Sequence, residues 1–182
     1  DVVYQFCRES RHAAILYPSH GRYVGASSKS LLEYRKQPGD RIGHHWYIPN
    51  VRGKRAIRHV TYDTNYWKSF VRSRIFVAKG DSGSLTLFGR KPQLHELFAA
   101  HCVSEYSVRV ESRGREVDEW KLRPEKADNH WWDCLVGCAV AASIEGASLP
   151  GAESLDKRKS RNSRSSSATR IKLSDLQRQR RP

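Results

Sequence analysis

The hydrophobic pattern is most continuous over residues 128–146, DNHWWDCLVGCAVAASIEG. After its polar start this stretch consists mainly of small and apolar residues, and it has the length of an ordinary helix. Asp128 is suited to the N-cap and Gly146 to the position just after the last turn. A helix that is apolar on most faces is typical of the interior of a domain. We therefore predict one buried helix from Asp128 to Gly146.

The rest of the pattern predicts shorter helices and strands that alternate along the chain. Helical spacing of apolar residues marks residues 1–10, 65–75 and 92–102. Residues 19–43 have the composition of a loop, with a short helix over 30–36. Strands are predicted at 12–17, 44–48, 55–62 and 85–88, with a hairpin that joins 106–111 to 117–122. This alternation indicates an α/β domain.

Composition changes abruptly after Leu149, where Ser, Arg and Lys become dominant. We expect a folded domain over 1–149 and a disordered basic tail over 150–182. The formal net charge of the chain is +14. Residues 151–182 carry ten Lys or Arg and three Asp or Glu, so half of the excess lies in the folded part. Such a charge favours a polyanionic partner, above all nucleic acid, although a passive basic surface has the same composition.

The cysteine pattern argues against a Cys-x-x-Cys site, and the hydropathy argues against a membrane-spanning protein. Cys7, Cys102, Cys134 and Cys138 form no Cys-x-x-Cys motif, so we expect buried free thiols in a reducing cytosol. An apolar run of 18 residues is absent from the sequence, and no membrane association is expected. Methionine is absent, including at position 1, from which we expect that an upstream part of the protein precedes this sequence.

Candidate chemistry lies on the predicted helix over 128–146. Asp133 stands one turn inside an apolar helix, where an ionised carboxylate is costly unless a partner compensates its charge. His130 lies three residues earlier and projects from the same face. A His-x-x-Asp pair that opens an Ala-rich helix suits a cation site at the edge of a core. The alternative is that Asp133 binds an arginine or a backbone amide and serves only the fold.

Four stretches give the sequence a resemblance to the nuclease half of phage terminase large subunits of the lambda-like GpA group. VVYQFCRES resembles the helix after the second acidic strand of that family, and RHVTYDTNYWKSFVRSRI resembles its strand–Asp–Thr–Lys helix. EWKLRPEKADNHWWDCLVGCAVAAS resembles its closing motif, and IKLSDLQRQRR resembles the basic end of many such proteins. The closing motif is the specific one of the four.

The resemblance implies an RNase H-like nuclease that lacks its N-terminal part. In that fold, carboxylates from separate elements hold two divalent cations about 4 Å apart, which activate water and stabilise the leaving oxygen of a phosphodiester. Hard carboxylate oxygens suit Mg²⁺ or Mn²⁺. By resemblance, Asp133 is the last of these metal-binding catalytic acids, and His130 is a candidate for contact with phosphate, water or metal. The remaining acidic ligands would precede residue 1, so this chain alone would be inactive.

The resemblance also implies partners and a location. The substrate would be concatemeric double-stranded DNA, cut during genome packaging in the cytoplasm of a bacterial host. The portal and the small terminase subunit are the expected protein partners. No G-x-x-x-x-G-K-[ST] motif occurs, so ATP would bind only in a motor domain upstream of this sequence.

Several alternatives remain open from the residues alone. Asp63 ends a predicted strand and precedes a predicted helix, and a helix cap is its preferred role over a place in the metal site. The basic face of that helix, with Lys68, Arg72 and Arg74, would meet either DNA or water. A non-enzymatic DNA-binding or packaging-adaptor module would have the same charge. An RNA-binding protein would instead need exposed aromatic platforms.

Overall fold

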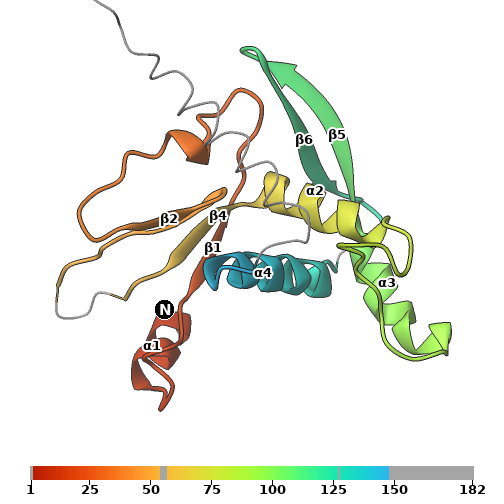
Figure 1. The fold of residues 1–182 in the computed structure, drawn as a ribbon, viewed down its shortest axis with the longest axis horizontal. Coiled ribbons are helices and arrows are strands. Elements are labelled where there is room, and N and C mark those ends of the chain that lie inside the picture. Colours follow the sequence, from red (N-terminus) through yellow and green to blue (C-terminus); the bar gives the residue numbers. More distant parts are fainter. Residues whose placement is uncertain (1, 54–56, 127, 148–182) are drawn as a thin grey trace, which may run out of the picture. The chain divides into compact units, whose positions relative to one another are not determined.

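The computed structural model describes residues 2–53, 57–126 and 128–147 (Figure 1). The predicted tail over 150–182 lies outside the described residues. The helices are α1 (Val2–Glu9), α2 (Thr64–Ile75), α3 (Glu96–Cys102) and α4 (His130–Ile144), with 3₁₀ turns η1 (Leu31–Glu33) and η2 (Pro92–His95). The strands are β1 (Ser19–Arg22), β2 (Arg41–Gly43), β3 (Trp46–Ile48), β4 (Val60–Asp63), β5 (Glu105–Ser112) and β6 (Arg115–Leu122). The predicted mixed α/β architecture is confirmed.

A four-stranded sheet has the order β1-β4-β3-β2. β1 and β4 are parallel, with Ser19 opposite Val60, whereas the pairs β4–β3 and β3–β2 are antiparallel. All four residues of β4 are buried, and all four of β1 are exposed. β4 is covered because it lies between two strands and carries the apolar residues Val60 and Tyr62, while β1 is a polar strand at the edge.

The second sheet is the predicted hairpin of β5 and β6, which projects from the body of the domain (Figure 1). Its turn holds Arg113 and Gly114 at positive φ angles of 53° and 70°. Two consecutive left-handed residues are the geometry of a tight hairpin turn that matches the twist of the strands. The hairpin was therefore correctly predicted from the alternation on both sides of SRGR.

The hydrophobic core joins α2 and α4 to both sheets. α2 contacts β6 as well as α4, so it lies between the hairpin and the closing helix (Figure 1). Three tryptophans, Trp67, Trp120 and Trp132, meet in this core and belong to α2, β6 and α4. Its other members are Trp46, Ile48, Val60, Tyr62, Val71, Val136 and Val140. Large aromatic residues pack against β-branched ones here and remove apolar surface from water.

The start of α4 differs by one residue from the prediction. Asn129, not Asp128, is the N-cap residue, and its carbonyl accepts the first helical hydrogen bond from the Asp133 amide at 3.0 Å. Gly146 has a φ of 79°, so the predicted left-handed glycine after the helix is confirmed.

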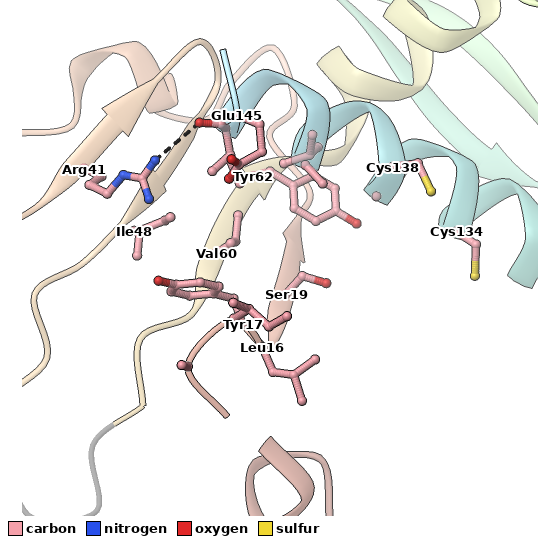
Figure 2. A pocket seen from close by; sticks show the side chains of 16 residues that line it. Leu16, Tyr17, Ser19, Arg41, Ile48, Val60, Tyr62, Cys134, Cys138 and Glu145 are labelled. Atoms are coloured by element: carbon pink, nitrogen blue, oxygen red, sulfur yellow. Dashed lines mark hydrogen bonds between the residues drawn. The ribbon is translucent and has the colours of Figure 1, made fainter. Parts of the chain in front are cut away.

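α4 is buried along one stripe and not on every face. Trp132, Val136 and Val140 recur every four residues and are its buried residues. Small side chains on another face leave a groove of about 690 Å³, which Cys134 and Cys138 line together with Val60 and Tyr62 (Figure 2). The prediction of a helix buried all round was wrong because small apolar residues do not by themselves indicate burial. The expectation that Cys134 and Cys138 are buried was wrong for the same reason, although both are free thiols.

Other differences between the predicted and observed elements lie in segments that are largely exposed. Residues 12–15 form turns and residues 16–17 are irregular, so the strand predicted over 12–17 is absent, and residues 85–88 are not part of a strand. The helix at the N-terminus is confirmed, but Val2 and Phe6 on its apolar face are exposed. From residue 72 to residue 100 no residue is buried. None of the helices in the described part combines the length and apolar character that a bilayer crossing requires.

The accessibility of the four cysteines predicts two classes of thiol. Cys134 and Cys138 are exposed, whereas Cys7 is buried and burial raises the pKa of Cys102. We expect an aromatic disulfide reagent to modify two thiols rapidly and two slowly at neutral pH, because reactivity requires an accessible thiolate. The double variant Cys134→Ser/Cys138→Ser should lose the rapid phase. A single rate for all four thiols would contradict this description of α4.

Candidate functional site

Asp133 lies in the first turn of α4 and faces α2. Its Oδ1 atom is 3.0 Å from Nζ of Lys68, and 48% of its side chain is exposed. The carboxylate therefore has a cationic partner on one side and remains open to solvent on the other. The partner is a lysine of the neighbouring helix, while an arginine or a backbone amide had been considered as the structural alternative.

Lys68 also binds Glu105, the first residue of β5. Its Nζ atom donates to both carboxylate oxygens of Glu105 at 2.7 Å. The exposed fractions are only 10% for the Lys68 side chain and 5% for that of Glu105. Asn129, the N-cap residue of α4, donates from Nδ2 to Oε1 of Glu105 at 2.5 Å. The start of α4 is thus tied to β5 and α2 by one buried carboxylate.

The charges of this cluster do not cancel. Two carboxylates share one ammonium group, so an ionised cluster keeps one negative charge. Glu105 is enclosed and fully hydrogen-bonded, as a buried charge must be. Asp133 is the member that water, a cation or a phosphate-bound ion can reach. The arrangement orients one accessible carboxylate on a rigid support.

His130 makes different contacts from Asp133. Its side chain is 78% exposed, and Nε2 lies 3.7 Å from Oδ1 of Asp128. Its ring centroid is 6.3 Å from that of His101, which is itself buried and accepts a hydrogen bond from the Trp131 amide. The structure therefore places His130 at the accessible start of α4, but gives it no contact partner in common with Asp133 among the described residues.

Asp63 caps α2, as preferred from the sequence. Its Oδ1 atom accepts a hydrogen bond from the Tyr66 amide at 3.1 Å, and the residue is 3% exposed. Oδ2 lies 3.4 Å from Nδ1 of His45, whose ring stacks on Tyr66 with centroids 3.8 Å apart. The helix cap favoured for Asp63 from the sequence is therefore present in the structure.

Tyr62 adds a phenol on the side of Asp133 and Cys134. Burial raises the pKa of its hydroxyl, and electrostatic interaction with Asp133 and Cys134 raises this pKa further. The phenol therefore remains protonated at neutral pH. It lines the apolar groove of α4 together with Cys134 (Figure 2), and Glu145 is the one carboxylate residue in that lining. That groove does not suit a divalent ion.

The described residues do not form a complete metal site. Groups of three or more His, Cys, Asp or Glu with suitable spacing are absent from residues 2–53, 57–126 and 128–147. Glu105 and Asp133 are close to one lysine, and only Asp133 is accessible. The donor set fits one ligand of a divalent cation and not a two-cation centre.

Comparison with known protein families identifies the family of the chain. The model of the endonuclease domain of terminase large subunit gpA matches residues 1–155 of the 182. The chain belongs to this gpA endonuclease family. The resemblance seen in the closing motif is thereby confirmed, and a phage terminase nuclease role is supported. No curated protein and no solved structure matches the chain.

Glu105, Asn129 and the buried position of Lys68 were missed from the sequence. Lys68 was grouped with Arg72 and Arg74 as a basic face, yet it follows Trp67 on the buried side of α2. The available signal was its place between Trp67 and Val71, one turn apart, which are both core residues. Glu105 opens a strand next to buried Ser104, and nothing in its local sequence indicates a lysine partner.

Loss of the shared ammonium group should be costly to the fold. In Lys68→Met, Glu105 remains buried without its cation, so we expect the free energy of unfolding to fall by about 3–5 kcal/mol. Lys68→Met/Glu105→Gln should recover most of this loss, since the amide oxygen of Gln still accepts from Asn129. Lys121→Met, at an exposed position of β6, is the matched control. Denaturant unfolding measures all three variants, and equal losses in the single and double variants would contradict the buried pair.

Substitution of Asp63 separates a helix cap from a metal ligand. Asp63→Ala removes the acceptor of the Tyr66 amide and should lower the free energy of unfolding by about 1 kcal/mol. Asp63→Asn keeps an oxygen acceptor at the N-cap and should be close to the parent. Chemical denaturation without divalent ions is the measurement. If Asn destabilises as much as Ala, the capping role is wrong.

Proposed function

We propose that this chain is part of a metal-dependent endonuclease that cuts concatemeric double-stranded DNA during phage genome packaging. The observation that carries the proposal is the half-exposed carboxylate of Asp133, oriented by Lys68 at the start of α4 in a member of the gpA endonuclease family. The net charge of +14 supports DNA as the substrate, because Lys and Arg side chains bind the phosphate backbone.

Asp133 would contribute one oxygen ligand to Mg²⁺ or Mn²⁺. Such cations, when bound, activate a water molecule and stabilise the leaving oxygen of a phosphodiester. The other acidic ligands would come from a part of the protein outside the described residues, which agrees with an RNase H-like arrangement of acids on separate elements. His130 would contact phosphate, water or metal from the exposed start of the same helix.

Lys68 and Glu105 would act as positioning residues for Asp133. Glu105 fixes the ammonium group of Lys68 from the buried side, and Lys68 then restrains one oxygen of Asp133. The second oxygen and the exposed half of the side chain stay available. A carboxylate restrained in this way loses little conformational freedom when it binds an ion.

The packaging context is part of the same proposal. ATP would be bound by a motor domain elsewhere in the full protein, and the portal and the small terminase subunit would be its partners in the host cytoplasm. The second candidate function is a non-enzymatic DNA-binding or packaging-adaptor module, which the basic charge alone would support.

Asp133→Asn in the terminase subunit that contains this domain tests the catalytic assignment. The change keeps the size of the side chain and removes its charge, so we expect nicking of plasmid DNA with Mn²⁺ to be lost while DNA binding is unchanged. Asp81→Asn is the matched control, because Asp81 is an exposed acid in the loop after α2. Undiminished cutting by Asp133→Asn would refute the assignment and favour the adaptor function.

A further inference from the structure

A second pocket lies beside the cluster of Lys68, Glu105 and Asp133. Unlike the apolar groove of α4, it is lined by aromatic rings and arginines. It has a volume of about 270 Å³ and lies between α2, the end of α3, the base of the hairpin and α4. This is just below the range of roughly 300–1,000 Å³ that is typical of ligand pockets, so it suits a group with a single ring system. Four aromatic rings and two guanidinium groups line it, namely Phe76, Tyr106, Trp120, Trp132, Arg72 and Arg123.

The two arginines are held against the aromatic rings. Cζ of Arg72 is 5.7 Å from the ring centroid of Trp120 and 5.5 Å from that of Phe76. Cζ of Arg123 is 5.2 Å from the ring centroid of Tyr106. Each arginine also uses one nitrogen in an anchoring hydrogen bond, to Oγ of Ser107 and to the carbonyl of Val103. Both guanidinium groups are thereby ordered.

Neither guanidinium group is neutralised by the described part of the chain. The ion pairs among those residues involve other cations, such as Lys68 with Glu105 and Arg109 with Asp118. Glu105 lines the same pocket, but Lys68 and Asn129 already bind its oxygens. Ordered, unpaired arginines at an aromatic pocket favour an anionic ligand that also has a flat ring.

Trp132 supplies an independent indication. The residue is 1% exposed, and its indole N–H has no hydrogen-bond acceptor among the described residues. An unsatisfied buried donor is uncommon in folded proteins and requires an explanation. Trp132 also lines the pocket, so a ring that enters the pocket would pack beside the residue that carries this unsatisfied donor.

We propose that this pocket receives one unpaired nucleobase of DNA. The base stacks among the aromatic rings, and its flanking phosphates bind Arg72 and Arg123. Stacking on aromatic and arginine side chains is the usual way in which proteins hold unpaired bases. A paired base is excluded because its partner strand and neighbouring bases do not fit a pocket of this size.

The position of the pocket indicates where in the DNA the captured nucleotide would lie. Trp132 directly precedes Asp133, and Glu105 contributes to both the pocket and the acidic cluster. On the basis of the proposed nuclease function, the captured base belongs to a nucleotide beside the phosphodiester that is cut. The preferred substrate would then be duplex DNA with a locally unpaired nucleotide.

Fluorescence of 2-aminopurine tests capture of the base in the 182-residue chain without divalent ions. The probes are an oligonucleotide with one 2-aminopurine as a single strand, in a matched duplex, and as an unpaired bulge in a duplex. We expect the single strand and the bulge to bind about tenfold more tightly than the matched duplex, with quenching of the probe by stacking. Phe76→Ala, Tyr106→Ala and Arg123→Gln should weaken the quenching and this preference.

Matched controls come from residues outside the pocket. Phe76 and Phe88 are both largely exposed, at 75% and 87%, so Phe88→Ala controls for loss of an exposed ring. Arg90→Gln, at an exposed position outside the pocket, controls for loss of one positive charge. Equal binding of bulged and matched DNA, or unchanged quenching in Phe76→Ala and Tyr106→Ala, would overturn the inference. The two proposals can fail separately. If Asp133→Asn still cuts DNA, the nuclease assignment is refuted. If the base is still captured in that case, the pocket inference stands.

Discussion

The ion pair between Lys68 and Glu105 is the interaction on which the rest of the domain depends. It joins α2 to the first residue of β5, and Asn129 and Asp133 attach the start of α4 to the same point. Two helices and the hairpin therefore share one buried polar junction. Such a junction adds little net stability compared with an apolar replacement, but it fixes orientation because every charge must find its partner. The domain thus gains a defined direction for Asp133.

Around this junction the aromatic core and the acidic cluster perform separate tasks. The side chains of Lys68 and Glu105 are only 10% and 5% exposed, so water screens their mutual attraction little. Asp133, by contrast, stays hydrated. The same helix therefore carries a packed stripe, an accessible carboxylate near its start and an open apolar groove on different faces. Residues one or two positions apart along α4 have unrelated roles because the helix turns them to different surroundings.

The sequence was informative where the pattern is local. The hairpin turn, the cap of α2 by Asp63 and the glycine after α4 follow from short-range chemistry, and they were predicted. β1 was missed because its residues, SHGR, are polar and its strand character comes only from pairing with β4. The pairing of Lys68 with Glu105 joins residues that are far apart in sequence, and a single sequence holds no signal for it. Asp133 stood out in the sequence because an acid in an apolar helix is unusual. Its partner Lys68 did not stand out, because a lysine on a helix with other basic residues is ordinary.

The long exposed segment between residues 72 and 100 has a consequence for how the domain responds to stress. With no buried residue in that range, opening it exposes little new apolar surface and costs little free energy. Fluctuations there would leave the tryptophan core undisturbed, since α3 is anchored at its far end by buried His101. Insertions, deletions and proteolytic nicks should therefore be tolerated between Val77 and Lys91, while α2 and α3 keep their shape.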